Sequence, residues 1–207
     1  MFIKHKKMTK IIAEIGINHN GSLTICKKLI NIAKQSGAWG VKFQYRNINN
    51  FLKCSVSDEI GKSIIDKELK RVNLSSPNII KLSNYAKSLK LNVGISFFNE
   101  QDIKDFSNYK FDFYKIPSAV CDDLLLIKKL QLKKKQLLVS LGGKSEREIK
   151  KLSKIYFKIL KTKSICFMHC ISNYPLKEEN SQIFFIDNLK KFFKGYQIGY
   201  SSHENDI

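Results

Sequence analysis

The chain has 207 residues, 43% of them hydrophobic, which is enough for one large domain or two small ones. No apolar run approaches the ~18–20 residues that a membrane span needs, so we expect no membrane association. The 37 basic and 18 acidic residues give a net charge of +19, but the lysines are spread through helical segments without interleaved aromatic residues. This distribution disfavours a nucleic-acid-binding module, although the charge favours anionic ligands.

The start of the chain and the cysteines both indicate a cytoplasmic protein. Glu14 and Asn18 interrupt the first apolar stretch, which argues against a signal peptide. The five cysteines are odd in number and lack the spacing of a zinc site. We expect buried thiols in a reducing compartment. They are Cys26, Cys54, Cys121, Cys166 and Cys170.

Seven short and nearly continuous apolar runs predict strands that are buried on both faces. They are residues 11–17, 40–44, 92–96, 111–116, 136–140, 164–169 and 196–200. Helical patterns lie between these runs, and the clearest extends from Ser22 to Ser36. Further helix starts are indicated by Ser76 before Pro77, by Asp122 and Asp123, and by a capping box of Ser145 and Glu148. Residues 45–75 form the only long irregular insertion.

Seven strands with six crossovers predict a parallel α/β architecture in a single domain. The alternatives are an open doubly wound sheet and a (β/α)8 barrel. The first strand is not followed by Gly-x-Gly-x-x-Gly, which weakens the dinucleotide-binding option. Polar residues follow nearly every strand, and a barrel brings such strand ends together in one pocket. We therefore expect a TIM-type barrel with about seven of its eight strands in residues 1–207.

Lysines and serines at the strand ends suit a phosphate or carboxylate group. Lys42 and Gln44 lie on one face of the second strand, and Val41 and Phe43 lie on the other. Lys115 ends a short apolar and aromatic run. On the residues alone, Lys115 is either a solvated charge or a cation directed at an anionic substrate.

One carboxylate and three histidines are the other candidate site residues. Glu14 lies in an apolar strand, where its burial is costly without a lysine, a metal or a substrate hydroxyl as partner. His203 follows the seventh strand and is a candidate metal ligand or general base. His169 lies within an apolar run and is better explained as a hydrogen-bonded core residue. His19 can equally be part of a loop with a tight turn.

Five motifs together resemble one known family. "IIAEIGINHNGS", "AKQSGAWGVKFQ", "FYKIPS", "HCISNYP" and "IGYSSH" occur in this order along nearly the whole chain. They look like the N-terminal catalytic barrel of the N-acetylneuraminate (sialic acid) synthase family, which includes legionaminate, pseudaminate and spore-coat polysaccharide synthases. The resemblance implies condensation of phosphoenolpyruvate with an N-acetylated amino sugar, such as N-acetylmannosamine. The product is a nine-carbon 2-keto sugar acid, phosphate is released, and a divalent metal (Mn²⁺ or Mg²⁺) is required.

The resemblance also assigns roles to individual residues. Phosphoenolpyruvate would be held by Lys42, Ser96, Lys115, Ser118, Ser140, Ser172 and Ser201, although Ser172 stands where many members have asparagine. The sugar would contact Glu14, Gln44 and Tyr174, and His203 would be a metal ligand. Glu14, Lys42 and Lys115 would be the catalytic residues. A Schiff base on Lys115 is the alternative chemistry, which an anion-lined site disfavours.

Three features depart from the family pattern. Val120 stands where members have a glutamate that contacts the sugar, so we expect a different sugar or weaker sugar binding. Residues 140–143, Ser-Leu-Gly-Gly, replace Ser-Thr-Gly-Met, and we expect a repacked loop. The chain ends at Ile207, so by resemblance the eighth strand, a second metal histidine and the C-terminal antifreeze-like domain are absent. The alternatives are a synthase module, alone or as a homodimer, and an inactive or split fragment that needs a complementing chain.

Overall fold

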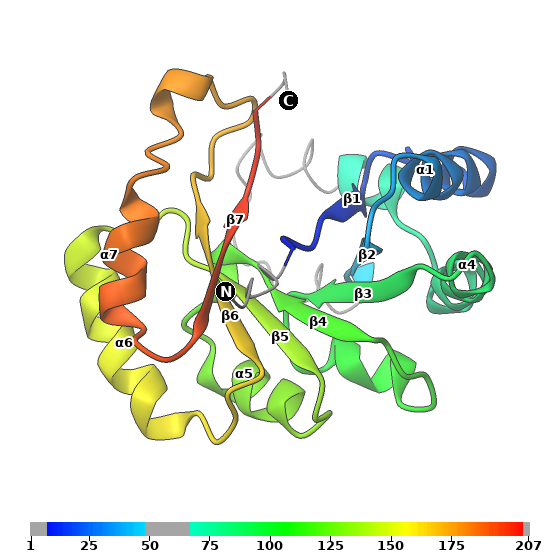
Figure 1. Ribbon diagram of the computed structural model, residues 1–207. Helices are drawn as coiled ribbons and strands as arrows, with labels where there is room; N and C mark the ends of the chain where they lie inside the picture. Colours follow the sequence, from blue (N-terminus) through cyan, green and yellow to red (C-terminus); the bar gives the residue numbers. More distant parts are fainter. Residues whose placement is uncertain (1–7, 49–66, 205–207) are drawn as a thin grey trace, which may run out of the picture. The chain divides into compact units, whose positions relative to one another are not determined.

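The computed structural model describes residues 8–48 and 67–204, and Figure 1 shows the strands and the helices that connect them. The strands are β1 Ile12–Gly16, β2 Gly40–Tyr45, β3 Asn92–Phe97, β4 Phe113–Ile116, β5 Gln136–Ser140, β6 Ile165–Cys170 and β7 Gln197–Ser201. They form one sheet in the order β1-β2-β3-β4-β5-β6-β7. Every crossover advances by one strand, which is the order of a TIM-type barrel and not of a doubly wound sheet. All seven predicted strands are confirmed, with ends shifted by at most two residues.

Local sequence signals explain where the helices begin. The helices are α1 Leu23–Gln35, α4 Ser76–Ser88, α5 Leu124–Gln131, α6 Glu146–Ile159 and α7 Phe185–Phe192, with 3-10 helices at Asp102–Phe106, Ser118–Val120 and Glu178–Asn180. Ser22 caps α1, Asp123 caps α5, and the predicted capping box opens α6. The predicted cap of α4 was wrong by one residue, because Ser75 is the N-cap and its side chain makes no capping hydrogen bond.

Two compact units divide the chain, Met1–Gln44 with Ile48–Gly94 and Tyr45–Asn47 with Ile95–Ile207, so that the ends of both β2 and β3 belong to the second unit. The first unit contains β1, β2, α1 and α4. Helices α1 and α4 lie side by side in it and bury small and aliphatic side chains, among them Cys26, Ile30 and Leu82. The register between β1 and β2 sets Glu14 opposite Lys42, just before an irregularity in the pairing. This register places the first two candidate residues next to each other.

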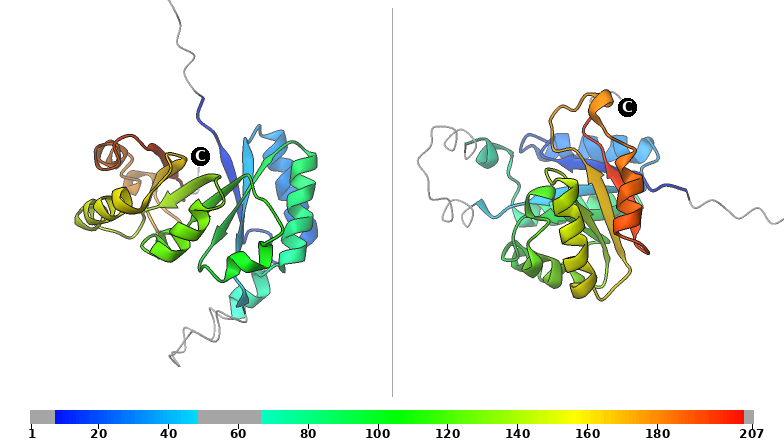
Figure 2. Two further views of the ribbon diagram at one scale, coloured as in Figure 1. Left: turned by 90° about the horizontal axis from the view of Figure 1, so that it is seen from below. Right: turned by 90° about the vertical axis from the view of Figure 1, so that its left-hand side faces the viewer.

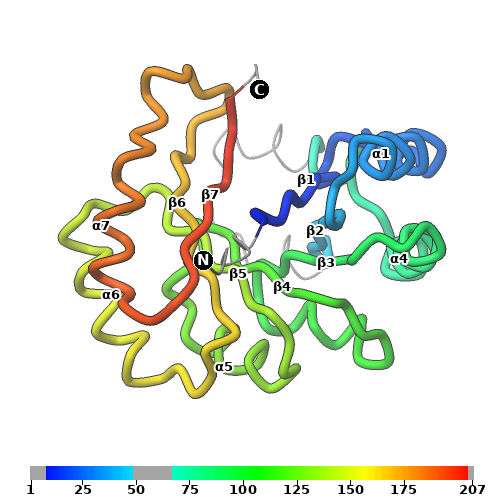
Figure 3. The backbone as a smooth tube through the Cα atoms, viewed as in Figure 1, coloured from blue at the N-terminus to red at the C-terminus, as the bar shows by residue number. Residues whose placement is uncertain are grey.

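The second unit contains β4 to β7 with α5 to α7. Strands β6 and β7 run side by side, and α7 packs against both and lies beside α6 (Figures 2 and 3). Lys115 on β4 donates a hydrogen bond to Ser201 on β7, at 3.1 Å. In a flat sheet these strands would be three spacings, or about 14 Å, apart, which is farther than a lysine side chain reaches. Strands β4 to β7 therefore curve around a concave face, as barrel strands do.

Two sequence predictions about the fold were wrong. Strand β7 is not buried on both faces, because all five of its residues are at least partly exposed. In the described part of the chain β7 pairs only with β6, so one edge of the strand has no covering neighbour. The insertion at 45–75 is not irregular throughout, because residues 67–72 are helical and Arg71 pairs with Glu68 within that turn. The middle of the insertion lies outside the described residues.

Candidate active site

In the first unit, Glu14 and Lys42 form an ion pair. Their carboxylate and ammonium groups are 2.5 Å apart, and the Lys42 side chain is only 5% exposed whereas that of Glu14 is 46% exposed. A buried ammonium is stable only with a counter-charge, which Glu14 provides from the neighbouring strand. Of the three partners expected for Glu14, the structure shows a lysine, but the carboxylate is half exposed and not buried as the expectation assumed. Gln44 follows Lys42 by two residues on the same strand and is partly exposed.

In the second unit, serines and one lysine gather at the ends of β4, β5 and β7. Lys115 bonds to Ser201, as described above. The Ser118 hydroxyl accepts from the Gly142 backbone N–H at 3.0 Å and lies 3.5 Å from the Cys170 sulfur. Hydroxyl and backbone donors close to an ammonium are groups that bind phosphate or carboxylate oxygens.

Ser140, the last residue of β5, has a buried hydroxyl without a partner. The residue is 1% exposed, and its oxygen makes no hydrogen bond within the described ranges 8–48 and 67–204. A buried hydroxyl without a hydrogen-bond partner lowers the free energy of unfolding. Such a group persists either because a ligand forms a hydrogen bond with it or because the loss of stability is tolerated. Ser96, at the end of β3, is also buried.

Gly142 explains how the loop after β5 packs. A Cβ atom at this position would collide with the Ser172 hydroxyl and would lie 2.9 Å from the Cys170 carbonyl oxygen. Only a residue without a side chain lets the two loops approach this closely. The glycine therefore allows both Ser118 and Ser172 to lie against the loop after β5.

His203 contacts the loop that follows β6 through both ring nitrogens. Nδ1 lies 2.6 Å from the Ile171 carbonyl oxygen, and Nε2 lies 3.0 Å from the Tyr174 hydroxyl. A carbonyl oxygen only accepts, so Nδ1 carries a proton, and in the neutral ring the Nε2 lone pair then accepts from the Tyr174 hydroxyl. A histidine oriented by a carbonyl in this way is typical of a metal ligand.

Glu204 was not found from the sequence, yet it organises the end of β7. Its carboxylate accepts hydrogen bonds from the Tyr200 hydroxyl, from the Ser202 hydroxyl at 2.5 Å and from the His203 backbone N–H at 3.0 Å. The Ser202 and Tyr200 hydrogen bonds lower the pKa of Glu204 to about 2. The sequence feature that could have indicated Glu204 is its position directly after His203, a candidate metal ligand.

The two other candidate histidines, His169 and His19, are structural. His169 is 4% exposed, bonds to the Ser181 carbonyl oxygen at 2.8 Å and stacks on Tyr200, which confirms the core interpretation. His19 is 3% exposed and accepts from the Gly21 backbone N–H at 3.0 Å, and burial lowers the pKa of its ring. His19 is therefore part of the predicted turn.

A buried carboxylate after β3 was also missed. Asp102 is fully buried and accepts from the Asn47 backbone N–H at 3.2 Å and from the Asn99 side-chain amide at 3.1 Å. Burial raises the pKa of Asp102 to about 6. This carboxyl group ties the segment after β2 to the loop after β3, which residue spacing alone could not show.

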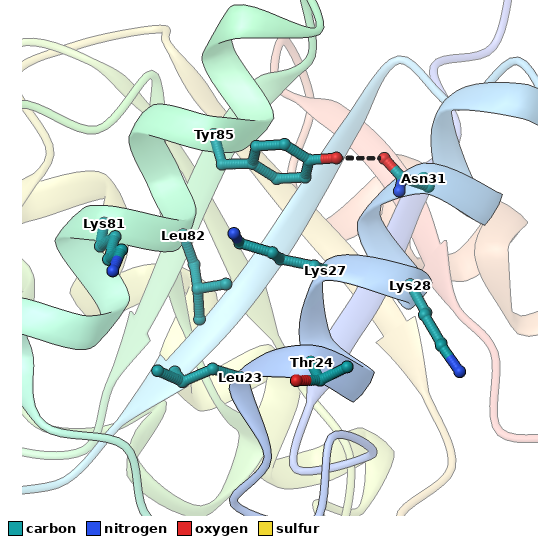
Figure 4. Close-up of a pocket in the computed structure, with 8 residues that line it drawn as sticks. All are labelled: Leu23, Thr24, Lys27, Lys28, Asn31, Lys81, Leu82 and Tyr85. Carbon is teal, nitrogen blue, oxygen red and sulfur yellow. Dashed lines mark hydrogen bonds between the residues drawn. The ribbon is translucent and has the colours of Figure 1, made fainter.

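The described ranges contain no cluster of metal ligands, and the residues that line one surface groove are not predicted site residues. These ranges contain no group of three or more His, Cys, Asp and Glu side chains that could hold a metal ion, so His203 would supply a single ligand. A surface groove of about 400 Å³ lies between α1 and α4 (Figure 4). Its lining includes Lys27, Asn31 and Tyr85, with a 2.7 Å hydrogen bond from Tyr85 to Asn31, and none of the predicted site residues.

Every described helix is too short or too polar to cross a bilayer.

Together, the strand order and the curvature of β4 to β7 define a TIM-type α/β fold with polar residues at its strand ends. The NeuB family model matches residues 29–207, and the chain belongs to this family. The family resemblance of the five motifs is thereby confirmed.

Two of the similar curated proteins are synthases of legionaminic acid and of N-acetylneuraminate 9-phosphate. The chain is 30% identical to the N,N'-diacetyllegionaminic acid synthase of Campylobacter jejuni over 97% of this chain and 62% of the relative. It is 27% identical to the human N-acetylneuraminate-9-phosphate synthase over 95% of this chain and 56% of the relative. The chain thus spans less than two thirds of the length of these relatives.

Solved structures establish the fold independently. The N-acetylneuraminic acid synthetase of Leptospira borgpetersenii superposes with a TM-score of 0.80 at 24% identity, covering 94% of this chain and 65% of that one. A putative spore coat polysaccharide biosynthesis protein E from Chromobacterium violaceum superposes with a TM-score of 0.82 at 23% identity. The match covers 96% of this chain and 60% of that one. The prediction of a TIM-type α/β fold is confirmed.

Proposed function

We propose that the chain condenses phosphoenolpyruvate with an N-acetylated amino sugar, forming a nine-carbon 2-keto sugar acid and releasing phosphate. The observation that carries this proposal is the group of Lys115, Ser201, Ser118 and the unpaired Ser140 at the strand ends, in a family of sialic-acid-type synthases. The four described cysteines are buried free thiols, which suits a cytoplasmic reaction.

In this proposal Lys115 and the serines hold the anionic groups of phosphoenolpyruvate. The Ser201 hydroxyl already lies against the Lys115 ammonium, so a substrate oxygen can bind between donors that are in place. Carbon 3 of phosphoenolpyruvate attacks the sugar aldehyde, positive charge develops at carbon 2, and water adds there. Phosphate then leaves by C–O cleavage, and the lysine ammonium neutralises the charge that the leaving group gains.

The Glu14–Lys42 pair would supply further contacts to the substrates. By family resemblance Lys42, Ser96 and Ser172 are assigned to phosphoenolpyruvate, and Glu14, Gln44 and Tyr174 to the sugar. Because Glu14 is half exposed and Lys42 is buried, the carboxylate can turn to a sugar hydroxyl once a substrate anion provides the counter-charge for Lys42.

The donor chemistry of His203 fits one ligand of a divalent cation. Its Nε2 atom carries a lone pair, and the Ile171 carbonyl holds the ring in that tautomer. When bound, Mn²⁺ or Mg²⁺ would act as a Lewis acid toward the open-chain sugar aldehyde.

Phosphate release tests the proposed reaction. The purified chain is incubated with phosphoenolpyruvate, Mn²⁺ and a panel of N-acetylated amino sugars, and phosphate and product mass are measured. We expect release only when an accepted sugar is present, and we expect its loss in Lys115→Met. Lys128→Met, which changes an exposed lysine on α5, is the matched control. If no sugar elicits release even with the remaining region of a relative supplied, the alternative of a non-catalytic fragment is favoured.

A further inference from the structure

We propose that the groove between α1 and α4 binds a small organic phosphate, at a site that shares no residue with the predicted active site (Figure 4). The proposal goes beyond the proposed function and does not depend on it. Its basis is the lining of the groove, which supplies positive charge and hydrogen-bond donors but no carboxylate. The volume of about 400 Å³ lies within the range of ~300–1,000 Å³ that is usual for small-molecule sites.

The positive charge of the groove comes from three lysines. Lys27 and Lys28 lie on α1, and Lys81 lies on α4. The Lys27 side chain extends toward α4, and its ammonium lies 5.2 Å from the centroid of the Tyr85 ring. Within residues 8–48 and 67–204, none of the three lysines forms an ion pair with a carboxylate. Like charges that line one groove repel each other, and a bound anion offsets this repulsion.

The lack of carboxylates distinguishes α1 and α4 from other lysine-rich helices of the chain. On α6, Lys150 pairs with Glu146 at 2.8 Å, and on α7, Lys190 pairs with Asp187 at 2.7 Å. Helices α1 and α4 together contain five lysines and neither aspartate nor glutamate. Pairs three or four residues apart stabilise a solvated helix, and α1 and α4 have no such pairs. Their charge is therefore better explained by an external anion than by solvation alone.

A tyrosine and an asparagine place a further donor in the groove. The Tyr85 hydroxyl donates a hydrogen bond to the Asn31 side-chain oxygen at 2.7 Å. Because the oxygen is occupied, the amide NH₂ group is what Asn31 offers to a ligand. Leu82, which is 1% exposed, and Leu23 supply apolar surface beside these polar groups. A phosphate on an organic body matches this lining, because ammonium groups bind phosphate as point charges and the apolar surface accommodates the rest of the ligand.

Calorimetric titration with ATP at low ionic strength tests the site. We compare the full chain, the double variant Lys27→Met with Lys81→Met, and the double variant Lys34→Met with Lys87→Met. One exposed ion pair changes an equilibrium constant up to about fivefold, so we expect the first double variant to bind ATP roughly three- to twentyfold more weakly. The second is the matched control, because it removes one lysine from each helix outside the groove and should bind ATP as the wild type does.

Asn31→Asp provides a second test of the same groove. The aspartate still accepts the hydrogen bond from Tyr85, but a negative acceptor replaces the NH₂ donor. We expect ATP affinity to fall about tenfold or more, and thermal unfolding without ligand shows whether the variant is folded.

Three results would overturn the site. They are equal weakening of ATP binding in both double variants, unchanged affinity in Asn31→Asp, and no ATP binding to the wild type. A loss of ATP affinity in Lys115→Met instead would assign the binding to the predicted active site and would overturn the groove as well. Failure of the proposed reaction would look different, because phosphate release would be missing while the groove variants still differed in ATP affinity.

Discussion

Removal of the Ser140 hydroxyl should stabilise the fold and weaken substrate binding at the same time. This hydroxyl is buried and has no partner in the described parts of the chain, and such a group costs roughly 1–3 kcal/mol. We expect Ser140→Ala to raise the free energy of unfolding by about 1 kcal/mol, which is roughly 2–4 °C in Tm for a chain of this size. If the hydroxyl binds phosphoenolpyruvate, the loss of a hydrogen bond to a charged group should weaken that binding about tenfold or more.

Ser83→Ala is the matched control for this experiment. Ser83 in α4 is also fully buried with an unpaired hydroxyl among the described residues, and no substrate role is assigned to it. Its replacement should stabilise the chain at least as much, since alanine is also the better helix former, and should leave phosphoenolpyruvate affinity unchanged. Urea unfolding and calorimetric binding provide the two quantities. Unchanged affinity in Ser140→Ala, or equal weakening in both variants, would refute the reasoning.

Three further predictions follow from single contacts. Glu14→Gln removes the carboxylate that pairs with the buried Lys42 ammonium, so the free energy of unfolding should fall by about 1–3 kcal/mol. Added phosphate should restore more stability to the variant than to the wild type, and equal phosphate effects would contradict this. The pKa of Asp102 is raised to about 6, so the folded chain holds this proton more tightly than the unfolded chain. As pH falls from about 6 to about 4, the free energy of unfolding of the wild type should therefore rise by up to ~3 kcal/mol relative to that of Asp102→Asn. Urea unfolding at several pH values measures this difference, and parallel pH profiles would contradict the raised pKa of Asp102. Gly142→Ala should destabilise the chain by about 1–3 kcal/mol because its methyl group meets Ser172, and unchanged urea denaturation would disprove the close approach.

The sheet and the helix starts could be predicted because their determinants are local. Interior strands such as β5 and β6 are continuous apolar runs, and the caps of α1, α5 and α6 are single residues or short motifs. The incomplete burial of β7 could not be predicted in this way, since it depends on which strands lie beside it. The helix at residues 67–72 is too short and too charged to show an apolar stripe.

The sequence predicted individual residues of the candidate site but not the contacts between them. Spacing and resemblance identified Lys115 and Ser201, but their contact joins residues 86 positions apart. The contact between Tyr174 and His203 depends likewise on how two loops meet. Glu204 and Asp102 were missed because a carboxylate in a polar segment is usually solvated, and only the folded structure shows the hydrogen bonds that hold these two.

Calorimetric binding of phosphoenolpyruvate to the wild type, Lys115→Met and Lys128→Met tests the central claim most directly. If the strand ends of the second unit hold this substrate, the wild type and Lys128→Met will bind it with equal affinity. Lys115→Met will then bind it at least tenfold more weakly, because the variant lacks the ammonium group that bonds to Ser201. Equal affinity of all three proteins, or no binding to any of them, would contradict the assignment of this site.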